Sequence, residues 1–167
     1  KAHGLRGGVL LPSVAPDVKW IEPLYSRAYD PLWAEIQDLE LVVNIHSGTG
    51  SPDYGPYPIS LPIRLHETPW WSIRSYQHLI IAGVFHRFPK LEYIVTEAGC
   101  AWVPEVLTRL DALWDRVRSG FAGEFQFNTD AVTPEKPSFY AKRNCFYGAS
   151  SPSPRELAGT ASAHDGR

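Results

Sequence analysis

The sequence predicts an α/β fold with a parallel sheet, and within that class part of a closed barrel of strand–helix units. Short apolar strands alternate with amphipathic helices along the 167 residues, and the strands lack the apolar–polar alternation of a half-exposed sheet. No glycine-rich phosphate loop follows any strand, which disfavours a nucleotide-binding, doubly wound sheet. Only four strands are visible, whereas a complete barrel has eight strands in about 250 residues.

The four strands are bounded by turn-forming residues. Glycines precede a short strand at 8–12, and the apolar run 41–45 ends at His46 before a loop rich in glycine and proline. Further strands are expected at 90–97 and within 143–151. Gly and Pro at the ends of apolar runs are typical of strand boundaries.

Helix signals separate the strands. Residues 29–40 are expected to form a helix with Asp30 as N-cap and Pro31 in the first turn, because proline is favoured there. The same pattern, with Thr68 as N-cap and Pro69 first, predicts that the second helix begins only after a long loop at 47–66.

The remaining segments follow the same alternation. A third helix is expected at about 102–118, with apolar residues at helical spacing. A polar loop at 120–137 leads to the last strand, and Ser153 with Pro154 predicts the start of another helix.

Composition disfavours nucleic-acid binding and membrane insertion. The net charge of −2 and pI near 6.3 give no basic surface for nucleic acid. Apolar runs are too short for a membrane span, and no signal peptide opens the sequence. Two cysteines in no metal-finger spacing favour a reducing compartment, so a cytoplasmic protein is expected. Because the sequence contains no methionine, we expect a fragment of a longer protein.

Candidate functional residues lie where strands end. In parallel barrels the carboxyl ends of the strands line the active site, and here they carry Ser13, His46–Ser47, Glu97 and Ser150–Ser151. A histidine and a carboxylate on adjacent strand ends indicate a divalent metal site or a general acid–base pair. Trp102 follows Glu97 closely enough to form a wall of a pocket.

Other interpretations of these residues remain open. A lone histidine is more often a surface or hydrogen-bonded core residue than a ligand, and Glu97 needs only a cation or solvent near it. Cys145 is better explained as a buried, inert thiol. A hydrolase that uses Cys145 or Ser150 as nucleophile is a weaker alternative.

Three stretches resemble one protein family. "VVNIHSGTG", "GVFHRFPKLEYIVTEAGCAWVPEVLTRLD" and "PSFYAKRNCFYGASSPSPREL" are similar to the amidohydrolase-related proteins close to aminocarboxymuconate-semialdehyde decarboxylase. The resemblance implies a TIM (β/α)8 barrel, of which this chain holds roughly strands 4–7 with their helices. It also implies a metal-dependent enzyme, with zinc the expected ion, that decarboxylates or hydrolyses small, often aromatic, carboxylic acids.

The resemblance assigns roles to individual residues. His46 matches the metal-ligating histidine of the fifth strand, and Glu97 occupies the place of a catalytic histidine on the sixth. Ser47 and Trp102 are expected to contact substrate. The family's other metal ligands are a His-x-His pair and an aspartate on the eighth strand; the sequence has no His-x-His, and Asp165 falls too early for that aspartate.

We therefore expect one partial domain, 1–167, whose parent is a metal-dependent hydrolase or decarboxylase. Its expected partner is a small carboxylic acid, with no nucleic acid and no membrane; association into a homo-oligomer is left open. The alternative from another class is a non-catalytic half-barrel that serves as a binding or assembly module. Its open sheet edges would favour pairing with a complementary chain.

Overall fold

The protein is built on a four-stranded parallel sheet. The computed structural model describes residues 2–4, 7–148 and 152–158. Neighbouring strands of this sheet are all parallel and follow the order β1 (Val9–Leu10), β2 (Val42–His46), β3 (Glu92–Thr96) and β6 (Cys145–Gly148). Strand order in space equals order along the chain, as in the wall of a barrel; a doubly wound sheet would reverse direction.

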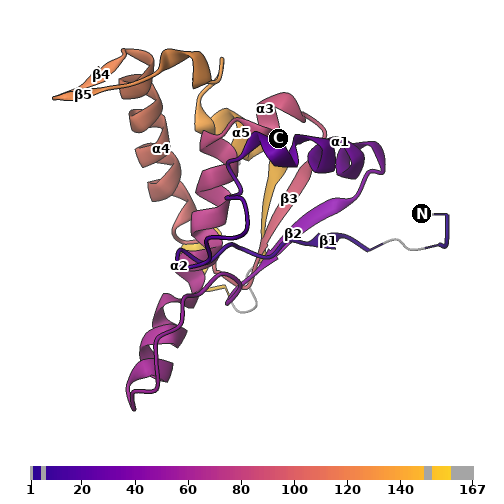
Figure 1. Cartoon of the computed structure of the whole chain (residues 1–167), viewed down its shortest axis with the longest axis vertical. Coiled ribbons are helices and arrows are strands. Elements are labelled where there is room, and N and C mark those ends of the chain that lie inside the picture. The colour runs from indigo at the N-terminus through magenta and orange to yellow at the C-terminus, as the bar shows by residue number, and fades with distance from the viewer. Residues whose placement is uncertain (1, 5–6, 149–151, 159–167) are drawn as a thin grey trace.

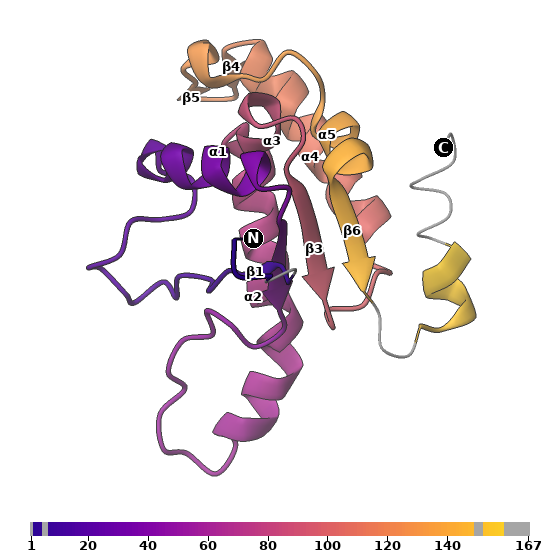
Figure 2. The ribbon, with the colours of Figure 1, turned by 90° about the vertical axis from the view of Figure 1, so that its right-hand side faces the viewer.

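Helices cover the sheet on one side. In Figure 2, α2 and α4 lie behind β3 and β6. The helical elements are η1 (Arg27–Tyr29), α1 (Asp30–Asp38), α2 (Ser60–Ile81), α3 (Val84–Arg87), α4 (Val103–Arg118), η2 (Thr129–Ala131) and α5 (Pro137–Asn144). Within the described ranges, no helix is long and apolar enough to cross a membrane.

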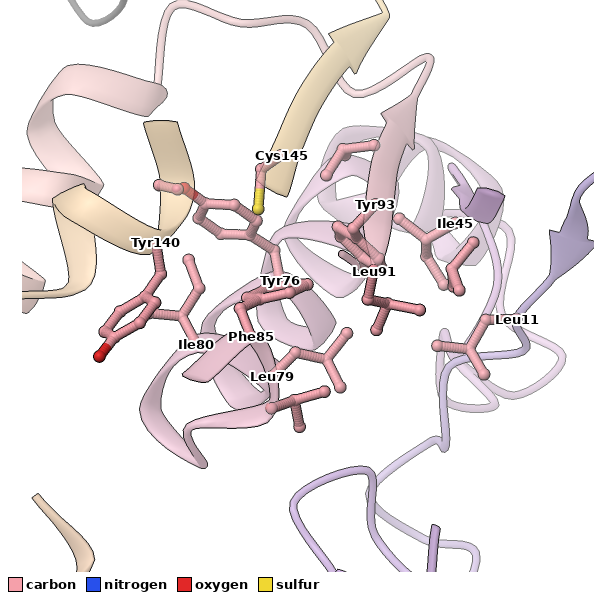
Figure 3. Close-up of a cluster of buried hydrophobic side chains, with 14 of the residues drawn as sticks. Leu11, Ile45, Tyr76, Leu79, Ile80, Phe85, Leu91, Tyr93, Tyr140 and Cys145 are labelled. Atoms are coloured by element: carbon pink, nitrogen blue, oxygen red, sulfur yellow. The ribbon is translucent and has the colours of Figure 1, made fainter. Parts of the chain in front are cut away.

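The strand register defines the face that packs on the helices. Val43 pairs with Tyr93, which pairs with Cys145, and all three side chains are buried. Because side chains alternate along a strand, Ile45 and Val95 point the same way and are also buried. Figure 3 shows Tyr76, Leu79 and Ile80 of α2 in this cluster with Tyr93 and Cys145.

The opposite face of the sheet is open, as expected for part of a barrel. Leu10, Asn44, Ile94 and Phe146 follow one another across it. Leu10 is 62% exposed and Phe146 39% exposed. In a closed barrel this face is the interior, filled by side chains from strands around the ring. The described residues supply four of these strands, so the predicted partial barrel is confirmed.

The predicted start of the second helix is wrong. α2 begins at Ser60 and continues through Pro69 to Ile81, and the preceding loop is correspondingly shorter. Thr68 does not cap the helix: its hydroxyl donates to the Arg64 carbonyl one turn back, at 2.7 Å. Pro69 leaves the carbonyl of Leu65 without its helical donor, yet the helix continues. Its first half extends beyond the sheet (Figure 1).

Asp30 also differs from its predicted role as N-cap. Tyr29 is the N-cap of α1, and Asp30 is its first helical residue. The Asp30 carboxylate accepts from Arg87 Nη2 at 2.8 Å and from Arg27 Nε at 2.7 Å. Arg87 is in α3, so this ion pair connects α1 to the segment that leads into β3.

The segment 120–144 holds more structure than the predicted polar loop. A small antiparallel hairpin joins β4 (Phe121–Ala122) to β5 (Phe125–Gln126). The unpredicted helix α5 then precedes β6. Its first turn is anchored to α4, because Ser138 donates from its hydroxyl and its backbone N–H to the Asp111 carboxylate, at 2.6 and 2.9 Å.

The predicted helix start after the last strand is confirmed. Residues 154–158 are helical. The Ser153 hydroxyl accepts from the Glu156 N–H at 3.2 Å, and the Glu156 carboxylate accepts from the Ser153 N–H at 2.8 Å. This reciprocal pair is a capping box.

Replacing Asn144 by alanine tests the junction between α5 and β6. The buried Asn144 amide donates to the carbonyls of Pro89, at 3.1 Å, and Leu91, at 2.8 Å. Asn144→Ala leaves the buried Leu91 carbonyl without this donor, and we expect a loss of about 1–3 kcal/mol in unfolding free energy. Denaturant titration measures it. Gln126→Ala, an exposed amide, is the control and should change stability by less than about 0.5 kcal/mol. Equal losses in both variants would contradict this role.

A second stability prediction concerns the Asp30–Arg87 ion pair and pH. Burial raises the pKa of Asp30, but hydrogen bonds from Arg87 and Arg27 and their positive charges outweigh it, so the pKa lies below its usual value. A carboxyl whose pKa is lower in the folded state stabilises the fold at any pH above its unfolded-state pKa, about 3.9. This stabilisation is lost as the pH falls through the pKa of the folded state.

We therefore expect Asp30→Asn to lower the unfolding free energy by roughly 1 kcal/mol at pH 7, and to match the wild type at a pH well below 3.9. Denaturant titrations at both pH values test this. Asp38→Asn removes an exposed carboxylate from the same helix and should change stability by less than about 0.5 kcal/mol at pH 7. A difference for Asp30→Asn that persists in acid would rule out the ionic origin.

Candidate functional site

The structure brings His46 and Glu97 together at the carboxyl edge of the sheet. His46 is the last residue of β2, and Glu97 directly follows β3. The His46 Nε2 and Glu97 Oε2 atoms are 3.1 Å apart, and the two side chains are 47% and 49% exposed. Both therefore remain accessible to a ligand. The two residues lie on adjacent strand ends, as the sequence predicts, and their roles in a site stay predictions.

The imidazole of His46 is oriented by its own backbone neighbour. His46 Nδ1 lies 2.9 Å from the Ser47 carbonyl oxygen. A carbonyl can only accept, so Nδ1 carries a proton, and in the neutral ring Nε2 then carries a lone pair. The His46 carbonyl in turn accepts from Ser72 of α2 at 3.2 Å and from Thr49 at 2.9 Å. The end of β2 is thereby held against α2.

The backbone of Glu97 has an uncommon conformation. Its φ of 59° lies in the left-handed region, which costs a residue with a Cβ roughly 1–2 kcal/mol. In continued strand geometry, Glu97 would share the helix-covered face of Tyr93 and Val95. The left-handed turn instead places its carboxylate beside His46, while its N–H donates to the Gly148 carbonyl at 3.0 Å.

The electrostatics of this pair call for a positive charge. With neutral His46, the Nε2 lone pair faces an oxygen of an acceptor-only carboxylate. Two acceptors 3.1 Å apart repel unless a proton or a cation lies between them. The pair therefore fits proton transfer or cation binding equally.

The two donors match a zinc site in their spacing but not in their number. Two ligands of a tetrahedral zinc ion lie about 3.3 Å apart, given bonds of about 2.0–2.1 Å, so the spacing of His46 and Glu97 fits a shared ion. The number of donors does not. Throughout the described part of the chain, no three His, Cys, Asp or Glu side chains gather as potential ligands, and zinc sites use three or four protein ligands.

Ser47 holds the two strand ends together through its backbone. Its N–H donates to the Thr96 carbonyl at 3.1 Å, and its carbonyl faces the His46 ring. The predicted contact of Ser47 with substrate stays a prediction.

Trp102 lies in an aromatic cluster next to the site loop. Its indole N–H lies within hydrogen-bond distance of the Ala98 and Gly99 carbonyls, at 3.1 and 2.9 Å. Its ring meets the rings of Tyr76 and Tyr147 edge to face, with centroids 5.2 and 5.6 Å apart. Trp102 thus fixes the turn after Glu97, and its role as a pocket wall stays a prediction.

Sequence reasoning missed the residues that support this edge from α2. The hydroxyl groups of Tyr76 and Tyr147 are 2.8 Å apart, and burial, followed by the neighbouring Tyr147, raises the pKa of Tyr76 well above its usual value. Ser72 and Tyr76 lie four residues apart, on one face of α2. The sequence shows this spacing, but it does not show that the Ser72 hydroxyl binds the His46 carbonyl, 26 residues away.

The alternative nucleophiles gain no support. Cys145 is buried, with no exposed surface, so a substrate has no access to its sulfur. Ser150 lies outside the described residues.

Several solved structures share this fold. An amidohydrolase from Mycobacterium avium subsp. paratuberculosis is 21% identical with a TM-score of 0.62, over 84% of this chain and 34% of that protein. 5-Carboxyvanillate decarboxylase from Sphingomonas paucimobilis is 20% identical with a TM-score of 0.63, over 95% and 44%. A dihydroxybenzoic acid decarboxylase from Polaromonas, with bound manganese and the inhibitor 2-nitroresorcinol, is 15% identical with a TM-score of 0.62, over 94% and 46%.

These matches define the extent of the similarity. The chain spans less than half the length of each of the three structures. No curated protein matches it. The profile of the amidohydrolase family covers residues 1–146, which include β1, β2, β3 and the His46–Glu97 pair. The chain therefore belongs to the amidohydrolase family.

Proposed function

We propose that His46 and Glu97 form one side of a cation-dependent active site in an enzyme that decarboxylates or hydrolyses small, often aromatic, carboxylic acids. The observation that carries this proposal is the position of His46 Nε2, 3.1 Å from the Glu97 carboxylate, in a ring oriented by the Ser47 carbonyl. Such a pair is built to receive a positive charge.

The matched structures support the substrate class. They include decarboxylases of 5-carboxyvanillate and of dihydroxybenzoic acid, and the latter contains manganese. A divalent ion at such a site stabilises negative charge on a carboxylate or on a bound water. Zinc is the ion that the family resemblance implies, and manganese is the alternative. Two donors cannot hold either ion tightly, so the remaining ligands must come from outside the described residues.

The chain's own residues have defined tasks in this proposal. His46 offers Nε2 to the ion, and the Ser47 carbonyl keeps the ring in the required tautomer. Glu97 accepts or releases a proton at the same place, or orients a water molecule. Ser47 and Trp102 flank the pair and are proposed to contact the substrate.

A second candidate function follows from the open face of the sheet. Leu10 and Phe146 expose apolar side chains there, and β1 and β6 are edge strands of the sheet. Such a surface suits a half-barrel that assembles with a complementary chain. This alternative requires no ligand at His46, so a metal titration distinguishes it from the enzymatic proposal.

Titration of the purified chain with Zn²⁺ tests the proposal. Four-ligand zinc sites supply about 10–16 kcal/mol; with two donors we expect a Kd on the order of 10–100 µM. His46→Ala should weaken binding at least tenfold, because it removes the nitrogen ligand. His66→Ala removes an exposed histidine of α2 and is the matched control. Calorimetry measures the affinity, with Mn²⁺ titrated in parallel. Equal Zn²⁺ affinity of His46→Ala and wild type would refute the role of His46 as a metal ligand. It would favour the non-catalytic assembly module instead.

Glycine substitutions test whether the backbone strain at Glu97 serves the site. Glu97 and Glu40 both have positive φ, 59° and 51°, a conformation that glycine adopts without a steric penalty. We expect Glu97→Gly and Glu40→Gly each to raise the unfolding free energy by up to about 1 kcal/mol. Only Glu97→Gly should weaken Zn²⁺ binding.

Denaturant titration and calorimetry on the same two variants give both readouts. Unchanged zinc affinity in Glu97→Gly would show that the carboxylate is not part of the site. Lower stability in both variants would contradict the prediction that a positive φ costs free energy at these two positions.

A further inference from the structure

A cavity lies between the loop after β1 and the middle of α2. Nine residues of the loop between Val14 and Tyr25, without Asp17 and Glu22, form one wall, and Arg74, Ser75 and His78 of α2 form the other; the volume is about 270 Å³. It shares no lining residue with the His46–Glu97 pair. This volume is close to the lower end, about 300 Å³, of pockets that take small molecules.

The polar part of this cavity is cationic. Lys19, Arg74 and His78 line it, and among its lining residues, all of them described, none is Asp or Glu. Burial, and then the charge of Arg74, lower the pKa of His78. His78 is therefore neutral near pH 7, and the positive charges at the cavity are those of Lys19 and Arg74.

Arg74 is held in place while keeping donors available. Its Nη1 donates to the Val14 carbonyl at 3.0 Å, which fixes the guanidinium at the wall of the cavity. A guanidinium has five N–H groups in a planar fork suited to a carboxylate. Lys19 donates to the Pro16 carbonyl at 2.6 Å, and an ammonium has three donors.

The rest of the wall is apolar or aromatic. Val14, Val18, Ile21 and Leu24 line it with Tyr25. The Tyr25 ring meets the His78 ring edge to face, with centroids 5.3 Å apart. A cationic end beside an apolar wall selects a ligand that carries an anionic group on an apolar body.

We propose that this cavity binds a small monocarboxylate with an apolar body, its carboxylate on Arg74 and Lys19 and its body against the loop 14–25. The planar fork of Arg74 favours a carboxylate over a spherical anion. The cavity volume limits the body to about one ring. This site is independent of the proposed cation site, because no residue is shared.

Benzoate is the probe for this proposal, and benzamide is its uncharged control of the same shape. From the efficiency of small ligands we expect benzoate to bind with a Kd on the order of 1 mM. Benzamide should bind at least tenfold more weakly, because it cannot pair with the cations. Amide chemical shifts from ¹H–¹⁵N spectra measure both affinities and should change in residues 14–25 and 74–78.

Substitutions of the two cations test whether benzoate binds in this cavity. Arg74→Gln and Lys19→Gln should each weaken benzoate binding several-fold or more, while Arg116→Gln, an exposed arginine on α4, should leave it unchanged. Lys19 is exposed, so its variant carries the test if Arg74→Gln disturbs the loop.

His46→Ala should bind benzoate like the wild type, which distinguishes failure here from failure of the proposed function. The proposal is overturned if benzamide binds as well as benzoate, or if the shifts map to residues around His46. It is also overturned if Lys19→Gln and Arg116→Gln bind benzoate equally.

Discussion

The parallel pairing of β2 with β3 is the constraint on which the candidate site depends. Val42 pairs with Glu92 at one end of this ladder and His46 with Thr96 at the other. Parallel strands end at the same edge of a sheet, so this register places His46 beside the residue that follows Thr96. A shift by one residue would move His46 away from Glu97 and would also turn the buried row of β2 toward the open face.

The backbone conformation of Glu97 is the second feature that brings the pair together. Strand alternation alone would direct Glu97 toward the helices, into the apolar environment of Val95. A carboxylate buried there would need a partner of its own. The left-handed conformation, with φ of 59°, turns Glu97 to the accessible edge, where it meets His46. Backbone strain of this kind is common at functional sites, and here it selects the face on which the carboxylate acts.

The fold also explains why the chain can carry two separate binding surfaces. One face of the sheet packs on helices through Tyr93, Val95 and the side chains of α2 (Figure 3), and the other is the open, barrel-interior face. The proposed cation site lies at the carboxyl edge, on the side of the open face. The cationic cavity lies between α2 and the loop that follows β1, and Arg74 and His78 of α2 line it. α2 therefore supports both surfaces with different sides of one helix.

The sequence by itself determined the order of parallel strands and helices, the helix start at Ser153 and the two strand ends that carry His46 and Glu97. These features are local: they depend on apolar spacing, turn residues and strand boundaries. Only the tertiary structure decided that α2 continues through Pro69, that α5 precedes β6, and that Glu97 turns toward His46. Each of these depends on contacts between residues distant in sequence, such as Ser138 with Asp111 and the Glu97 N–H with Gly148, and no local pattern encodes the energy of such contacts.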